Sequence, residues 1–225
     1  MRVTQTDIEL LKKKVLQLEK SVYLLTQQVY STNEYSSFNT SLQELKFFDF
    51  NTEVLRYVIQ WIDKFTTSDL QPPLGIYING PFGVGKTFIM EALVNQLSSL
   101  NIPSALVSVP DMYRKLKDTF NKGTTEAFVT YLKTVPVLIL DDIGAENVSP
   151  WGRDEILGPL LSFRARRNFP TLFTSNYNLE ELYDHFLGTE PTNKSHMQAR
   201  KIMELITPYV TCFELSGPNM RIEVL

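Results

Sequence analysis

The sequence has few of the residues that build disulfide scaffolds or protein-held zinc sites. It contains one cysteine, Cys212, and two histidines, His185 and His196, in 225 residues. One cysteine excludes an internal disulfide, and this set lacks the ligand spacing of a structural zinc site. We therefore expect Cys212 to be an inert, half-buried residue.

Long apolar runs and a strong net charge are also absent. No stretch approaches the roughly 20 apolar residues of a membrane span, and the N-terminus lacks a secretory signal pattern. These absences predict a cytoplasmic protein with no membrane partner. The net charge of -3 argues against bulk electrostatic coating of nucleic acid, so a DNA contact needs a local basic face.

The first 30 residues carry a heptad pattern. Apolar residues recur at spacings of three and four: Ile8, Leu11, Val15, Leu18, Val22, Leu25 and Val29. β-Branched residues at one position of the repeat and leucine at the other favour a parallel two-stranded coiled coil. A single amphipathic helix lying on its own domain is the alternative. Residues 1–30 are thus predicted to form a helical arm.

Residues 31–46 read as a linker, because periodicity is lost and Ser, Thr and Asn accumulate. Residues 47–225 are predicted to form one domain. Short apolar runs at 74–78, 105–109, 137–140 and 171–174 alternate with longer helical patterns. This alternation predicts an α/β fold with a central, mostly parallel sheet flanked by helices.

The first of these runs leads into GPFGVGKT (residues 80–87) and then a helical pattern. The motif G-x-x-x-x-G-K-[ST] between a strand and a helix is typical of phosphate-binding loops. Its glycines turn backbone N–H groups inward, the lysine reaches the β- and γ-phosphates, and the threonine holds Mg²⁺. The predicted nucleotide-binding residues here are Gly80, Pro81, Phe82, Gly83, Val84, Gly85, Lys86, Thr87 and Phe88.

Two adjacent carboxylates, Asp141 and Asp142, end the apolar run of LILDDIGAE. Buried charge is costly unless it is paired. A carboxylate at this place in phosphate-loop NTPases holds Mg²⁺, so Asp141, with Thr87, is the predicted metal ligand. Asp142 is then predicted to orient or deprotonate the attacking water. Asp142 as a helix-capping or solvated acid is the alternative, and Glu146 is a weaker candidate for the water.

TLFTSN (residues 171–176) is another apolar run that ends in polar residues. If its strand lies beside the other two, Asn176 is placed near the γ-phosphate and can hold the attacking water. We therefore group Asn176 with Asp142 as a candidate catalytic residue.

Three segments together carry a family resemblance: GIYINGPFGVGKTFIMEAL, VPVLILDDIGAENVSPWGRDEILGPLLSFR and FPTLFTSNYNLEELYDHF. They resemble the AAA+ ATPase domain of bacterial DnaI-type helicase loaders, relatives of DnaC and of the IstB transposition helpers. The resemblance implies an ATP- and Mg²⁺-dependent switch that oligomerises on a DnaB-type replicative helicase and helps place it on single-stranded DNA. It places Asn176 at the sensor-1 position and Asp141 and Asp142 in the Walker B motif.

The sequence departs from the family pattern in three places. The heptad segment stands where DnaI has a zinc-binding N-terminal domain. In ARKIMELI (residues 199–206) the family's expected arginines fall on Lys201 and Leu205, and Arg200 lies one place early. Arg200 is the candidate arginine for a neighbouring subunit's nucleotide, with a solvated helix charge as the alternative. The family's C-terminal pair of arginines keeps only Arg221, the candidate sensor-2 contact.

Two short basic clusters are candidates for DNA contact. They are YRKLK (residues 113–117) and RARR (residues 164–167), with Tyr113 or Phe163 available to stack on bases. Solvated helix faces are the alternative. Two other functions also fit the sequence: an IstB-like transposition helper ATPase, and a non-hydrolysing, ATP-gated scaffold whose trans arginine is weakened.

Overall fold

The computed structural model describes residues 48–67, 72–119, 125–189 and 192–221. The predicted arm (1–30) and linker (31–46) lie outside these residues. Within the described ranges, no helix is long and apolar enough to cross a membrane.

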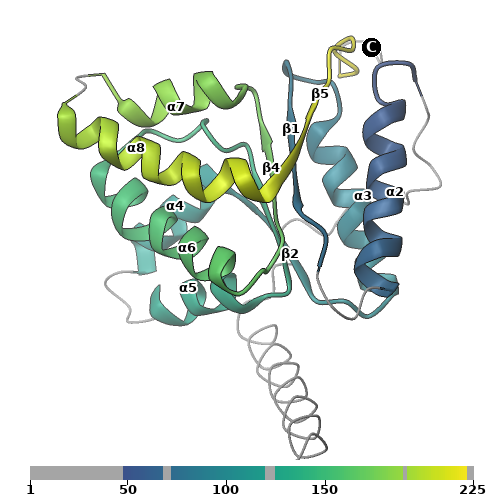
Figure 1. Cartoon of the computed structure of the whole chain (residues 1–225), viewed down its shortest axis with the longest axis horizontal. Helices are drawn as coiled ribbons and strands as arrows, with labels where there is room; N and C mark the ends of the chain where they lie inside the picture. Colours follow the sequence, from purple (N-terminus) through teal and green to yellow (C-terminus); the bar gives the residue numbers. More distant parts are fainter. Residues whose placement is uncertain (1–47, 68–71, 120–124, 190–191, 222–225) are drawn as a thin grey trace, which may run out of the picture. The chain divides into compact units, whose positions relative to one another are not determined.

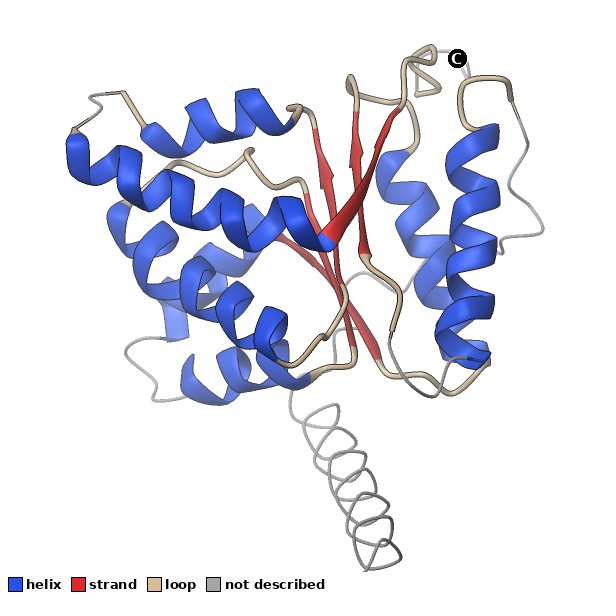
Figure 2. Cartoon of the chain, viewed as in Figure 1, coloured by secondary structure: helices blue, strands red, loops and turns tan. Residues whose placement is uncertain are grey.

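The described residues form one parallel five-stranded sheet with helices on both faces (Figures 1 and 2). The strand order is β2-β3-β4-β1-β5, and every neighbouring pair is parallel. The strands are β1 (Gly75–Asn79), β2 (Ser104–Ser108), β3 (Val137–Asp141), β4 (Thr171–Ser175) and β5 (Val210–Glu214). All five carboxyl ends therefore lie at one edge of the sheet.

Two helices cover one face and the remaining helices cover the other (Figure 1). The first face carries α2 (Thr52–Thr67) and α3 (Lys86–Ser99). The opposite layer contains α4 (Val109–Thr119), α5 (Thr125–Thr134), the π-helix η3 (Trp151–Leu157), α6 (Gly158–Arg166), α7 (Leu179–Leu187) and α8 (Asn193–Ile206). A 3₁₀ turn, η4 (Thr207–Tyr209), joins α8 to β5.

The side chains of each strand point alternately to the two helical layers, so the sheet has a core on both faces. Ile76 and Ile78 of β1 pack with the buried residues of α2 and α3, whereas Tyr77 between them faces the other layer and meets Phe173 of β4. Successive side chains of a strand point to opposite faces, so a strand buried on both faces must be apolar throughout. This requirement explains the continuous apolar runs in the sequence.

The predicted fold is confirmed: the four apolar runs form β1 to β4. The edge strand β5 was not predicted. Only Val210 at its start is buried, so the strand lacks the apolar run that marked the others. Cys212 lies in β5 and is exposed, so its expected half-burial is wrong.

Candidate nucleotide-binding site

The GPFGVGKT loop joins β1 to α3 at the carboxyl edge of the sheet. Gly85 has a φ of 94° and directly precedes α3, a left-handed conformation that glycine adopts without a Cβ clash. No side chain caps the start of α3, so its first N–H groups remain available to an anion. Val84 is buried beneath the loop, and Phe82 is 71% exposed above it.

Lys86 is buried and folded back onto its own loop. Its Nζ donates to the carbonyl oxygens of Gly80 (2.7 Å) and Pro81 (2.9 Å) and to Asn176 Oδ1 (2.8 Å). Burial lowers the pKa of Lys86, while the charges of Asp142 and Asp141 oppose that shift. The structure thus brings the phosphate loop, Asn176 and both aspartates into one cluster.

Asp141, the last residue of β3, faces Thr87 across the sheet edge. The Thr87 hydroxyl lies 3.1 Å from both Asp141 carboxylate oxygens. Burial raises the pKa of Asp141; the Thr174 hydrogen bond opposes this, and the neighbouring Asp142 charge adds to it. A hydroxyl and a buried carboxylate are the hard oxygen donors that Mg²⁺ prefers, so these two side chains fit the predicted metal.

Thr174 of β4 is a site residue that the sequence analysis missed. Its fully buried hydroxyl donates to Asp141 Oδ1 (2.5 Å) and accepts the backbone N–H of Asp142 (2.9 Å). Asp142 itself adopts a φ of 55°, which is uncommon for a residue with a side chain. Thr174 therefore sets the directions of both aspartates, a role that only the pairing of β3 with β4 reveals.

The C-terminal segment packs on the phosphate loop. The Met220 N–H donates to the Gly83 carbonyl (2.9 Å), and Asn219 Oδ1 accepts the Arg221 N–H (3.0 Å). The Asn219 side chain fills the space where a Cβ of Gly83 would stand. Burial is the main cause of the lowered Lys86 pKa, and the positive charge of Arg221 adds to it. Phe88, on the first turn of α3, is 42% exposed.

Arg200 is the predicted site residue that the described residues do not bring to the cluster. It lies on the exposed side of α8, where its Nε is 3.3 Å from Glu204 Oε1. Lys201, one position on, is also exposed, and Leu205 is partly buried. An exposed arginine remains compatible with a role at a neighbouring subunit.

The basic clusters predicted for DNA contact are partly structural. Tyr113 is buried and its hydroxyl donates to the Gly152 carbonyl (3.0 Å), so it is not available to stack on a base. Arg164 is fully buried, and burial lowers its pKa. The prediction is wrong for these two side chains. Arg166 and Arg167 of the second cluster are exposed.

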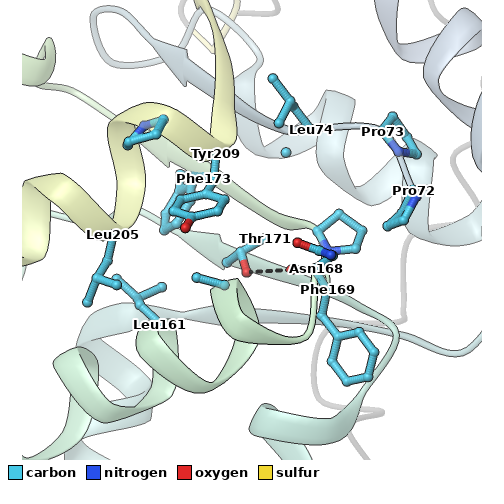
Figure 3. A pocket seen from close by; sticks show the side chains of 14 residues that line it. Pro72, Pro73, Leu74, Leu161, Asn168, Phe169, Thr171, Phe173, Leu205 and Tyr209 are labelled. Carbon is cyan, nitrogen blue, oxygen red and sulfur yellow. Dashed lines mark hydrogen bonds between the residues drawn. The ribbon is translucent and has the colours of Figure 1, made fainter.

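A separate cavity of about 200 Å³ opens at the amino ends of β1 and β4 (Figure 3). Pro72, Pro73, Leu74, Leu161 and Tyr209 are among its lining residues, and none of the described residues that line it is charged. A triphosphate needs positive charge or N–H donors. The charged cluster at the carboxyl edge, and not this cavity, is therefore the candidate nucleotide site.

Comparison with known proteins matches residues 25–200 to the family described as IstB-like ATP binding protein. The replicative helicase loader DnaI of Bacillus subtilis (strain 168) is 40% identical over 147 residues, which cover 65% of this chain and 47% of DnaI. The replicative helicase loader DnaC of Escherichia coli (strain K12) is 30% identical over 106 residues, covering 46% of this chain and 43% of DnaC. The chain spans about half the length of the curated relatives it matches.

A crystal structure of DnaI is 34% identical and has a TM-score of 0.68, covering 81% of this chain and 91% of that chain. The sequence, the parallel sheet and the phosphate loop therefore agree with one another, and the resemblance inferred from the motifs is confirmed. The chain belongs to the family of IstB-like ATP binding proteins.

Proposed function

We propose that residues 47–225 form an AAA+ ATPase domain that binds ATP and Mg²⁺ at the carboxyl edge of the sheet. The observation that carries this proposal is the convergence of Lys86, Thr87, Asp141 and Asn176 from three separate elements. Lys86 and the N–H groups at the start of α3 would hold the phosphates. Thr87 and Asp141 would hold Mg²⁺, which neutralises phosphate charge when bound.

Hydrolysis of ATP to ADP and phosphate is the reaction we assign to this site. Asp142 would accept a hydrogen bond from the attacking water and draw its proton, and Asn176 would fix the water's orientation. Arg200 of a neighbouring subunit would add positive charge at the transferring phosphate, and Arg221 would add it in cis. We expect slow, partner-dependent turnover, because the second arginine of the family pattern is replaced by Leu205.

We further propose that the protein is a cytoplasmic loader of a replicative, DnaB-type helicase onto single-stranded DNA. The relatives named as replicative helicase loaders support this assignment. Self-association would run through the AAA+ domain and the arm at residues 1–30. For DNA contact, the exposed basic side chains Lys117, Arg166 and Arg167 remain candidates.

The test measures ATP turnover by the full chain with and without single-stranded DNA and a DnaB-type helicase, together with co-purification of the helicase. Turnover that increases with both partners, and a stable helicase complex, support the loader. Tight ATP binding without turnover would instead indicate the nucleotide-gated scaffold. Turnover without any helicase complex would contradict the loader assignment.

A transposition helper is the second candidate, favoured by the family description, IstB-like ATP binding protein. A helper of this kind would bind target DNA and a transposase in place of a helicase. Parallel co-purification with a transposase separates the two, because each candidate predicts a complex with only one of these partners.

A further inference from the structure

Glu146 lies at the end of the loop that carries Asp142. We define the 142–146 loop as residues 142 to 146. The Glu146 carboxylate is buried, and its Oε2 accepts the Gly144 N–H at 2.7 Å. The Ala145 N–H closes the same loop onto the Asp142 carbonyl (3.1 Å). Glu146 is therefore placed to shape this loop.

The 142–146 loop needs such support because its backbone is strained. Asp142 has a φ of 55° and Gly144 a φ of 95°. A left-handed residue with a side chain is strained and persists only when its surroundings hold it. On the strand side, Thr174 and Ser175 hold the loop: Ser175 Oγ donates to the Ile143 carbonyl (2.6 Å). On the other side, Glu146 is the hydrogen-bonding group.

His185 of α7 lies against Glu146. Its Nε2 is 3.5 Å from Glu146 Oε1. Within the part of the chain that the structure describes, this Nε2 is buried and makes no hydrogen bond. A small change in the carboxylate's position would let the two groups bond directly, which would satisfy the buried Nε2.

The His185 ring also contacts the residue that follows Asn176. Its centroid lies 5.6 Å from that of Tyr177. Tyr177 in turn closes over Gly144, where a Cβ would stand 2.6 Å from the tyrosine ring. His185 thus contacts one residue from each segment that carries a proposed water-positioning residue: Glu146, four positions after Asp142, and Tyr177, the residue after Asn176.

The position of His185 is fixed by a well-anchored helix. A capping box of Asn178 and Glu181 begins α7. At its other end, buried Arg153 of η3 donates to the Phe186 carbonyl at 2.7 Å. The helix also packs along α8, the helix that carries Arg200 (Figure 1).

We propose that His185 and Glu146 are positioning residues for ATP hydrolysis. His185 packs against Glu146 and limits where its carboxylate can lie, Glu146 holds the Gly144 N–H, and the loop then holds Asp142 in line with Asn176. Neither residue touches the nucleotide. The inference rests on the proposed ATPase activity and assigns these two residues a function within it.

The test compares His185→Phe with His185→Gln in the full chain. Phenylalanine keeps the ring against Tyr177 but loses the nitrogen, whereas glutamine places an amide nitrogen near the position of Nε2. We expect His185→Phe to lower kcat about tenfold, because misplacing a reacting group by a fraction of an ångström already slows chemistry. The KM for ATP and the affinity for a non-hydrolysable ATP analogue should stay within about twofold, since the phosphate contacts remain. His185→Gln should restore most of kcat.

The second histidine supplies a matched control. His196 of α8 bonds the Tyr183 hydroxyl (3.0 Å) in an exposed position, so His196→Phe should leave kcat unchanged. Glu146→Gln, which keeps an acceptor for the Gly144 N–H, should retain more activity than Glu146→Leu. Amide hydrogen exchange at Gly144 gives a readout that needs no turnover: protection should fall in His185→Phe and Glu146→Leu.

Three results would overturn the inference. One is a wild-type kcat in His185→Phe; another is a loss of kcat matched by equal losses in nucleotide affinity and stability, as a purely structural role would give. The third is unchanged Gly144 protection in His185→Phe. If the wild-type protein shows no turnover under any condition, the proposed ATPase activity is wrong. The protection of the Gly144 amide in His185→Phe then decides by itself whether His185 and Glu146 hold the 142–146 loop.

Discussion

Two buried cations lie at opposite ends of the same strands, and they have different surroundings. Lys86, at the carboxyl edge, bonds two loop carbonyls and a side-chain amide, beside Asp141 and Asp142. Arg164, at the amino edge, is surrounded by main-chain carbonyls and makes no ion pair among the described residues. Both are costly to bury.

The two cations differ in whether their hydrogen-bond acceptors can be replaced by those of a ligand. Arg164 donates to the carbonyls of Leu132 (3.0 Å), Val135 (2.6 Å) and Pro170 (2.8 Å) and to the Thr171 hydroxyl (2.9 Å). Arg164 therefore links the segment before β3 to the start of β4, and its main-chain partners are part of the fold. Lys86 bonds two loop carbonyls and the Asn176 side chain, acceptors whose place a phosphate oxygen could take. A buried cation therefore indicates a ligand site only where its partners are exchangeable.

The largest expected effect comes from replacing Arg164. Arg164→Met keeps the apolar stem but leaves several buried carbonyls without donors, so the free energy of unfolding should fall by about 3 kcal/mol or more. Denaturant unfolding measures this loss. Arg166→Met, an exposed neighbour on the same helix, should change it by less than about 0.5 kcal/mol. Equal effects of the two variants would contradict the structural role of Arg164.

Thr174→Val should have the next largest effect. Valine matches the shape of threonine but removes the bonds to Asp141 and the Asp142 N–H, which lowers the unfolding free energy by about 1–3 kcal/mol. Because both aspartates lose a fixed direction, ATP turnover should fall more than ATP affinity. Thr174→Ser, which retains the hydroxyl, should recover turnover; a serine variant as slow as the valine variant would refute this role.

Replacing Asp141 should have a smaller effect on stability, and this effect should depend on pH. Its pKa is raised by burial, so the folded state binds this proton more tightly than the unfolded state does. The nucleotide-free protein should therefore lose stability as pH rises from the ordinary aspartate value through the raised one. Asp141→Asn should flatten that loss and be at least as stable at pH 7, measured by thermal unfolding in EDTA.

Metal binding should reverse the order of stability of the wild type and the Asp141→Asn variant. Mg²⁺ with a non-hydrolysable ATP analogue should stabilise the wild type, because the cation favours the ionised carboxylate. The same addition should stabilise Asp141→Asn much less. Equal stabilisation of both would show that Asp141 does not hold the metal.

The smallest predicted effect concerns the C-terminal segment. Asn219→Ala removes the bond to the Arg221 N–H and loosens the packing on Gly83. ATP affinity should weaken about threefold, the scale of one lost neutral hydrogen bond. A higher affinity in this variant would mean that the segment hinders the nucleotide instead of supporting it.

The main site was predictable from sequence because parallel strands bring their carboxyl ends to one edge. The phosphate loop, Asp141 and Asn176 each follow an apolar run, so their meeting required only the fold class. Thr174 was not predictable, since a threonine inside an apolar run looks like any β-former. Its role depends on the register of β4 against β3.

The errors have a common physical cause. RARR reads as a solvated basic face because burial of one arginine among three depends on the helix's rotation and on carbonyls far away in sequence. The edge strand β5 was missed because, among the described strands, it has a neighbour on one side only, and most of its residues are not buried. The contact between Glu146 and His185 joins residues 39 positions apart in the sequence, and no local sequence pattern indicates it.

The most direct test of the contrast between the two cations is the affinity of the full chain for a non-hydrolysable ATP analogue with Mg²⁺, measured by calorimetry for the wild type and Lys86→Ala. Our account predicts that Lys86→Ala loses about 100-fold or more in affinity, because a charge-assisted contact to phosphate is lost. The variant should still unfold cooperatively. Retained affinity in a folded Lys86→Ala protein would contradict the assignment of this loop as the nucleotide site.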